Sequence, residues 1–286
     1  MRIRIGFYYG FLTRRPYYLI RRAPSTWLRG VQPVSASDIP HVREGAEIPR
    51  ELQDEEVREI VEGFGEATRR AIQAGFYGVE IYGENTYLIK QFFSPHSNRR
   101  NDYWGGTLEK RMNFPLVVVQ SVKSDIEKHA DKPFILVYRI SPEEIEEPGI
   151  TLDDTLSLLM KLKNQGLDYI HVSLGNVAQT SPRDKESNTP TINIINKKIG
   201  DEIPIIGVGS VTTPDDALHA MEDLNLPLVA IGRGLIVEPD WIQKVKTGKE
   251  DTIRTEIHLE DRKDLSLPDA MWEYVQSRPG WLPIVK

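Results

Sequence analysis

Two short apolar runs that end in glycine constrain the fold of this chain most strongly. The first spans Ile203–Ser210, the second spans Leu228–Gly234, and a helical pattern lies between them. A continuous apolar run is typical of a strand buried on both faces, and strands joined by a helix pair in parallel with a right-handed crossover. The chain is therefore predicted to be an α/β protein.

The same alternation of strand and helix begins near residue 50. Further strands are predicted at Gly78–Ile81, Phe134–Tyr138 and Tyr169–Val172. Between the strands, apolar residues recur at helical spacing, as they do over Asn113–His129 and Thr191–Ile199. Successive strand–helix units of this kind favour a parallel sheet or a TIM barrel.

The ends of the two glycine-bearing runs indicate an anion site. Gly209 and Ser210 follow the first run, and Gly232 and Arg233 follow the second. Glycine lets a ligand approach the backbone N–H groups, and in TIM barrels the loops after the last two strands bind phosphate. A guanidinium beside them suits a phosphate dianion. The alternative, two ordinary strand-to-turn glycines, stays open.

Composition excludes several classes of protein. The 286 residues include no cysteine, which excludes disulfides and iron–sulfur clusters, and the six histidines show no metal-ligand spacing. The net charge of −6 argues against a nucleic-acid binder, and no apolar run is long enough to span a membrane. These features predict a cytoplasmic protein without a metal site.

The two ends of the chain differ from the rest. Residues 1–30 hold seven arginines, and the first acidic residue is Asp38, so this start is predicted to be atypical and non-native. Residues 31–250 carry the strand–helix pattern. Residues 251–286 form a charged and then aromatic tail, with Trp272 and Trp281, that is expected to pack on the barrel or on a partner.

The run from Gly78 to Arg111 resembles the Old Yellow Enzyme family of FMN-dependent NAD(P)H oxidoreductases. Val208–Ser210 and Ile231–Arg233 resemble the flavin-phosphate end of the same family, and the resemblance extends over residues 31–250. It implies a TIM barrel that binds FMN. It also implies hydride transfer from NADH or NADPH, by way of FMN, to an activated alkene or quinone, such as an enone.

The resemblance also implies roles for single residues. Tyr82 and Asn85 stand at the two positions that hydrogen-bond the substrate's carbonyl oxygen, and Tyr87 stands at the position of the proton donor. Arg139 is expected to face the pyrimidine edge of the flavin. Arg233 corresponds to the phosphate arginine, with Gly209, Ser210 and Gly232 as backbone donors.

The chain departs from the family pattern in two ways. The family usually has histidine at the position of Tyr82, which puts ordinary enone reduction in doubt. The family's first two strands have no counterpart here, so the barrel is predicted to be incomplete, with unpaired strand edges that a second copy of the chain could cover. A catalytically impaired remnant and another phosphate-binding TIM-barrel enzyme therefore remain as alternatives.

Overall fold

The computed structural model of the chain describes residues 30–42, 45–265 and 267–285. The atypical start predicted at residues 1–30 lies almost wholly outside them. The described chain divides into two compact units: residues up to Ser173 together with Thr180–Ile205, and Leu174–Gln179 together with the residues from Ile206 onward. The second unit includes residues on both sides of position 250, so the boundary predicted there stays a prediction.

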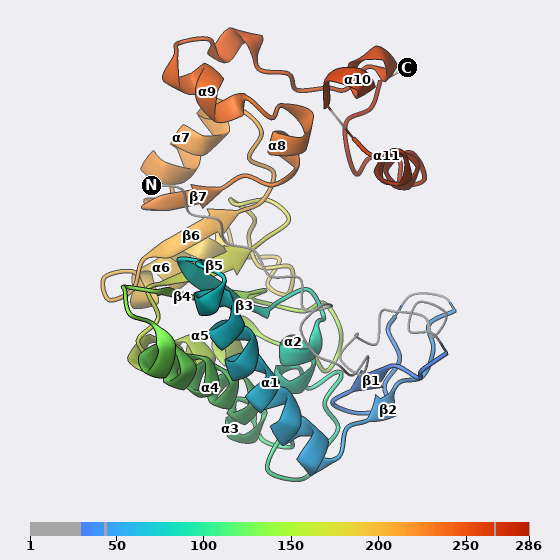
Figure 1. The fold of residues 1–286 in the computed structure, drawn as a ribbon, viewed down its shortest axis with the longest axis vertical. Coiled ribbons are helices and arrows are strands. Elements are labelled where there is room, and N and C mark those ends of the chain that lie inside the picture. The colour runs from blue at the N-terminus through green and yellow to red at the C-terminus, as the bar shows by residue number, and fades with distance from the viewer. Residues whose placement is uncertain (1–29, 43–44, 266, 286) are drawn as a thin grey trace. The chain divides into compact units, whose positions relative to one another are not determined.

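Three parallel strands lie side by side in the first unit: β3 (Gly78–Gly83), β4 (Ile135–Ile140) and β5 (Tyr169–Ser173) (Figure 1). β4 lies between the other two and pairs with both. All three strands were predicted, and each extends one or two residues beyond its predicted end. Because β3 is longer than predicted, it includes Tyr82, which the sequence placed just after the strand.

The helices of the first unit lie before, between and after its three strands along the chain. They are α1 (Asp54–Gln73), α2 (Leu88–Phe93), α3 (Leu108–Arg111), α4 (Asn113–His129), α5 (Leu152–Leu162) and α6 (Thr191–Ile199). α1 packs against α4, and the core between helices and strands includes stacked Phe92 and Phe114, whose ring centres are 4.1 Å apart. This packing fixes the strands from one face.

The ends of α1 show how the sequence sets a helix boundary. Asp54, Glu55 and Glu56 fill its first turn, where the helix dipole favours negative charge. The Glu56 side chain also accepts a hydrogen bond from the backbone N–H of Gln53, which precedes the helix. Gly75, with φ of +79°, follows the helix in the left-handed conformation that glycine adopts at low cost.

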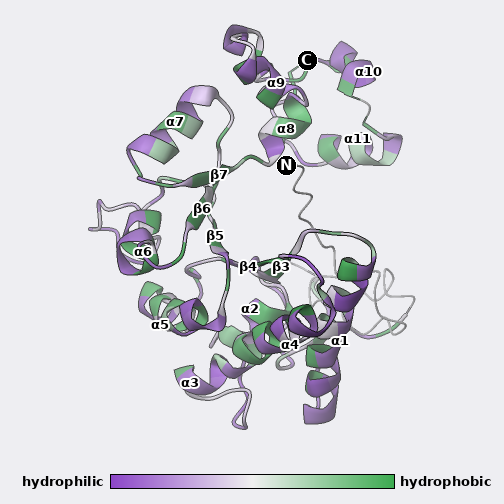
Figure 2. Cartoon of the chain, turned by 60° about the vertical axis from the view of Figure 1, so that its left-hand side comes forward, coloured by the Kyte–Doolittle hydropathy of each residue, from purple (hydrophilic) through white to green (hydrophobic). Residues whose placement is uncertain are grey.

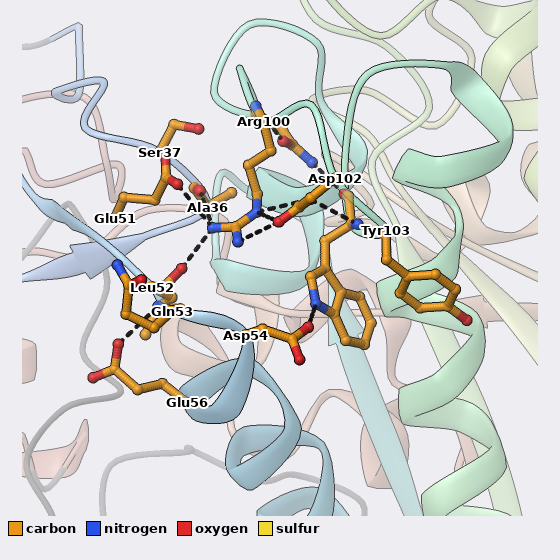
Figure 3. Close-up of polar contacts among 12 residues, drawn as sticks. Ala36, Ser37, Glu51, Leu52, Gln53, Asp54, Glu56, Arg100, Asp102 and Tyr103 are labelled. Carbon is orange, nitrogen blue, oxygen red and sulfur yellow. Dashed lines mark hydrogen bonds and ion pairs between the residues drawn. The ribbon is translucent and has the colours of Figure 1, made fainter.

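A short two-stranded pair, not predicted from the sequence, precedes α1. β1 (Val34–Ser35) pairs in parallel with β2 (Arg50–Glu51). The buried side chain of Arg100 holds this segment, because its Nη1 donates to the carbonyl oxygens of Ala36 at 3.2 Å and Leu52 at 2.6 Å (Figure 3). One guanidinium thus fixes the backbone directly after each of the two strands.

The second unit continues the strand–helix pattern. β6 (Ile205–Val208) and β7 (Leu228–Ala230) pair in parallel, which confirms the two glycine-ended strands. Its helices are α7 (Pro214–Glu222), α8 (Arg233–Val237), α9 (Trp241–Lys246), α10 (Arg262–Leu265) and α11 (Asp269–Gln276). Among the described residues, β3 and β7 each have a single sheet neighbour, whereas a closed barrel leaves no strand edge unpaired.

The C-terminal tail has an apolar core of its own within the second unit. Trp272 and Val275 on α11 pack with Ile257, Leu282 and with Val237 of α8. Figure 2 shows apolar residues on α11 beside polar ones, as expected for a helix with one buried face. Trp272 is buried and Trp281 is partly buried against the same cluster.

Candidate active site

Polar side chains occupy one face of the three parallel strands in the first unit. Tyr82 on β3 is in register with Arg139 on β4, and Arg139 is in register with His171 on β5. Residues in register on neighbouring strands point to the same face, and so do residues two apart on one strand. Glu80 and Ser173 therefore share this face.

Arg139 is the centre of this polar face. Its Nη2 donates to Ser173 Oγ at 3.1 Å, and its Nε lies 2.8 Å from Glu84 Oε1. Its Nη1 lies 3.9 Å from Glu80 Oε1, and the guanidinium sits over the ring of Tyr82 at 5.5 Å. The side chain of Arg139 is only 22% exposed, so these contacts are not those of an ordinary surface ion pair.

The three residues predicted to act on substrate lie close to one another. The rings of Tyr82 and Tyr87 meet edge to face, with centres 4.9 Å apart. Asn85 follows β3, and its backbone N–H donates to Ser141 Oγ at 3.0 Å. Burial, followed by the nearby carboxylate of Glu84, raises the pKa of Tyr82, so its phenol stays neutral at physiological pH. The structure therefore brings these residues together beside Arg139.

The loop after β3 carries strain at Thr86. Asn85 and Thr86 have φ of 48° and 61°, in the left-handed region. Asparagine tolerates this conformation, but the branched Cβ of threonine makes it a conformational outlier. The loop thus places Tyr87 at the start of α2, although the backbone conformation at Thr86 is unfavourable for threonine.

Replacing Thr86 with glycine is therefore expected to stabilise the chain. Relief of the left-handed strain, less the extra flexibility of glycine in the unfolded chain, should raise the free energy of unfolding by about 0.5–1 kcal/mol. Urea unfolding followed by circular dichroism measures this change. Thr107→Gly is the matched control, because Thr107 has φ of −75° and caps α3, so glycine should destabilise there. If Thr86→Gly and Thr107→Gly lower the free energy of unfolding equally, Thr86 carries no such strain.

The predicted phosphate residues lie in the second unit. Gly209 and Ser210 follow β6 with φ of 146° and 52°. A Cβ at Gly209 would lie 2.7 Å from the carbonyl oxygen of Leu174 and 2.8 Å from the amide nitrogen of Val177, so only glycine fits without a shift of the backbone. Ser210 Oγ donates to the carbonyl oxygen of Gly175 at 2.8 Å.

Gly232 and Arg233 stand at the start of α8. Gly232 is exposed, and a Cβ built on it would meet nothing within 4 Å, so a ligand could approach its backbone. The side chain of Arg233 is exposed, and its Nη1 donates to the carbonyl oxygen of Trp281 at 3.3 Å. A guanidinium carries five N–H donors, so this contact is compatible with binding an anion as well.

Sequence reasoning missed three partners of the predicted residues. Glu84 contacts Arg139, Glu80 Oε2 lies 2.9 Å from His171 Nδ1, and Ser141 Oγ donates to Asn85 Oδ1 at 3.4 Å. The alternation Glu80, Tyr82, Glu84 could have indicated the first two, because residues two apart in a strand share a face. The same spacing from Arg139 could have indicated Ser141, which, like Glu84, directly follows the last residue of its strand.

The described residues also bear on metal and membrane binding. Over residues 30–42, 45–265 and 267–285, no group of three or more His, Cys, Asp or Glu side chains could hold a metal ion. In the same part of the chain, no helix combines the length and the apolar character needed to cross a bilayer.

Comparison with known proteins identifies relatives over most of the chain. Residues 22–252 match the NADH:flavin oxidoreductase / NADH oxidase family. The chain is 46% identical over 239 residues to a protein of Bacillus subtilis named "Probable NADH-dependent flavin oxidoreductase YqiG", covering 84% of this chain and 64% of that protein. It is 44% identical to the "NADH:acrylate oxidoreductase" of Vibrio harveyi, covering 90% of this chain and 26% of that protein. The chain thus spans less than two thirds of the length of these curated relatives.

Solved structures share the fold of this chain. The chain superposes on the old yellow enzyme homologue of Zymomonas mobilis with a TM-score of 0.65 at 23% identity, covering 80% of this chain and 65% of that one. For morphinone reductase the TM-score is 0.61 at 25% identity, with 77% of this chain and 60% of that one covered. The described strands and helices therefore have the fold of a TIM barrel that is incomplete, as predicted. By its sequence match, the chain belongs to the NADH:flavin oxidoreductase / NADH oxidase family, which is the Old Yellow Enzyme relationship predicted from its motifs.

Proposed function

We propose that this chain is an NADH- or NADPH-dependent oxidoreductase that uses FMN as its cofactor and reduces an activated alkene or a quinone. The observation that carries the proposal is the clustering of Tyr82, Asn85, Tyr87 and Arg139 on one polar face at the ends of β3 and β4. Family membership and the names of the relatives support it. The proposed partners are small molecules, and the proposed location is the cytoplasm.

The side chains of the polar face suit a substrate that carries a carbonyl group. The Asn85 amide has N–H groups of the kind that can donate to a carbonyl oxygen, and its Oδ1 accepts from Ser141 Oγ, which helps to orient it. Tyr87 supplies an O–H that can act as a general acid toward the carbon next to that carbonyl. The ring of Tyr82, whose phenol is kept neutral by its surroundings, lies against the ring of Tyr87 and close to Asn85.

The residues at the ends of β6 and β7 fit the phosphate of FMN. Gly209 makes a turn that a Cβ would block, Gly232 is open to a ligand, and Arg233 is exposed. In the proposal, the backbone N–H groups of Gly209, Ser210 and Gly232 and the guanidinium of Arg233 hold the phosphate, and Arg139 faces the flavin ring. When bound, FMN supplies the hydride-transfer chemistry, which no side chain of this protein can provide.

Purification of the chain with added FMN tests the proposal. A yellow protein that oxidises NADH or NADPH in the presence of cyclohexenone or a quinone is the expected result. A folded, colourless protein without this activity would contradict it and would support the catalytically impaired remnant. Turnover of a sugar phosphate without flavin would support another phosphate-binding barrel enzyme, an alternative that the family match already disfavours.

Arg233→Ala tests the phosphate role directly. Loss of a charged hydrogen bond of about 1.5–3 kcal/mol should weaken FMN binding about 10- to 100-fold. Titration of the apoprotein with FMN, followed by flavin fluorescence, measures the dissociation constant. Arg278→Ala is the control, because this exposed arginine of the same unit lies over the ring of Tyr274 and has no assigned ligand role. Equal affinities for both variants would remove Arg233 from the site.

A further inference from the structure

Glu84 is a buried carboxylate that the predicted roles leave unexplained. Its side chain is 0% exposed, and neither of its oxygens has a hydrogen bond of good geometry. Its close charged neighbour is Arg139, whose Nε lies 2.8 Å from Glu84 Oε1. A buried carboxylate is stable only beside compensating charge or donors, so Glu84 depends on this guanidinium.

The contacts around Arg139 show that its charge is already compensated. Glu84 lies on one side, and Glu80 Oε1 lies 3.9 Å from Nη1. His171 faces Glu80 from β5 at 2.9 Å, and its side chain is 9% exposed. The two carboxylates of Glu80 and Glu84 thus face the one guanidinium of Arg139, and these three groups together carry a formal charge of −1.

Tyr82 and Asn85 tie Glu84 to the region where substrate is proposed to bind. Glu84 precedes Asn85 in the chain, and Arg139 sits over the ring of Tyr82 at 5.5 Å. Glu84 also raises the pKa of Tyr82, after the effect of burial, which is consistent with a carboxylate close to the phenol. An anion bound by Asn85 would therefore approach the Glu84 charge at short range in a partly desolvated place.

We propose that Glu84 is a positioning residue that fixes the guanidinium of Arg139 and cancels its charge, and that it thereby makes the site prefer uncharged electron acceptors to anionic ones. The preference for uncharged acceptors rests on the proposed function. The positioning of Arg139 does not, because it concerns two side chains of the chain itself.

A double-mutant cycle tests the positioning without any cofactor. Glu84→Gln, Arg139→Gln and the double variant are compared with the unmodified chain by urea unfolding. Each single variant should lower the unfolding midpoint, because it leaves the other charge buried without its partner, and the double variant should lose less than the sum of both. Strictly additive losses would overturn the proposal. Glu62→Gln, on the exposed face of α1, is the charge-matched control. If Glu84→Gln fails to fold, Glu84→Asp replaces it in the same cycle. Aspartate keeps the charge but shortens the side chain, so the coupling between position 84 and Arg139 can still be measured.

The acceptor preference is tested on the FMN-loaded chain with acrylamide and acrylate, which differ in charge at similar size. The ratio of kcat/KM for acrylamide to that for acrylate should fall about tenfold in Glu84→Gln, which corresponds to removal of one nearby like charge. Glu84→Asp and Glu62→Gln should keep the ratio of the unmodified chain. An unchanged ratio in Glu84→Gln would overturn the preference. A chain that takes up no FMN would contradict the proposed function instead, and the double-mutant cycle would still decide whether Glu84 positions Arg139.

Discussion

Gly209→Ala is expected to lose both stability and FMN binding. The new methyl group would lie 2.7 Å from the carbonyl oxygen of Leu174 and 2.8 Å from the amide nitrogen of Val177, and both are backbone atoms that cannot rotate away. The φ of 146° at this position also penalises any residue with a Cβ. Overpacking and backbone strain together should lower the free energy of unfolding by about 2–5 kcal/mol.

The contacts of Gly209 explain why FMN binding should fall as well. Its carbonyl oxygen accepts from the N–H of Val177 at 3.0 Å, and the N–H of Leu174 donates to Val208 at 3.2 Å. The turn after β6 and the segment that follows β5 therefore move together when a methyl group forces them apart. The proposed backbone donors at Gly209 and Ser210 would then be displaced from the phosphate.

Gly232→Ala separates the loss of stability from the loss of FMN binding. A Cβ at Gly232 meets nothing within 4 Å, so this variant avoids the clash expected at Gly209. Its φ of −105° and ψ of −88° lie near the edge of the helical region, so Gly232→Ala should cost much less stability than Gly209→Ala. Its methyl group should nonetheless hinder a phosphate at the start of α8. Urea unfolding and FMN titration of both variants measure the difference. A Gly209→Ala protein as stable as Gly232→Ala would show that the turn has room that the structure does not indicate.

The strands could be predicted because each is a short segment rich in apolar and β-branched residues, although β3, β4 and β5 also carry Glu80, Arg139 and His171. All five strands of the β3–β7 series were found in this way, from Gly78–Gly83 to Leu228–Ala230. β1 and β2 have two residues each, and no periodicity can be read over such a length. The tail was expected to pack through its tryptophans, but the residues that Trp272 contacts could not be named, because Val237 and Ile257 meet it only through contacts distant in sequence.

The candidate site also has features that could be predicted from the sequence and features that could not. Its four main residues were proposed from a family motif, and the strand register explains why Tyr82 and Arg139 meet. The charge balance around Arg139 could not be predicted, because the motif says nothing of Glu84 and because the distances to Glu80 and Glu84 depend on side-chain conformation. Sequence patterns locate the face of a strand, whereas the compensation of charge on that face depends on packing.

The second large effect is expected for Arg100→Met, which removes a buried cation from the loop between α2 and α3. Arg100 is 8% exposed, and besides Ala36 and Leu52 its guanidinium binds Asp102 through Nη2 at 2.6 Å and Nε at 3.0 Å (Figure 3). Methionine keeps the apolar stem but leaves the Asp102 carboxylate and two backbone carbonyl oxygens without this donor. Loss of one partner of such a network typically costs about 3–5 kcal/mol.

Arg99→Met provides the matched control for this change. Arg99 is the preceding residue and is exposed, and its Nε donates to the His96 carbonyl oxygen at 3.0 Å. Its replacement should therefore change the free energy of unfolding by no more than about 0.5 kcal/mol. Urea unfolding of both variants under identical conditions measures the contrast, and similar losses would show that the buried network contributes little.

The position of Arg100 gives its loss a consequence for the site as well. Asn98, two residues earlier, donates from Nδ2 to the carbonyl oxygen of Phe92 at 2.6 Å and to that of Trp104 at 2.8 Å, and so holds the C-terminal end of α2 to the same loop. α2 begins directly after Tyr87, the proposed proton donor. Arg100→Met should therefore lower kcat of the FMN-loaded chain more than it lowers FMN affinity. Tyr87 depends on α2 for its position, whereas the proposed phosphate residues lie in the other compact unit. Equal losses in kcat and in FMN affinity would point instead to partial unfolding of the whole chain.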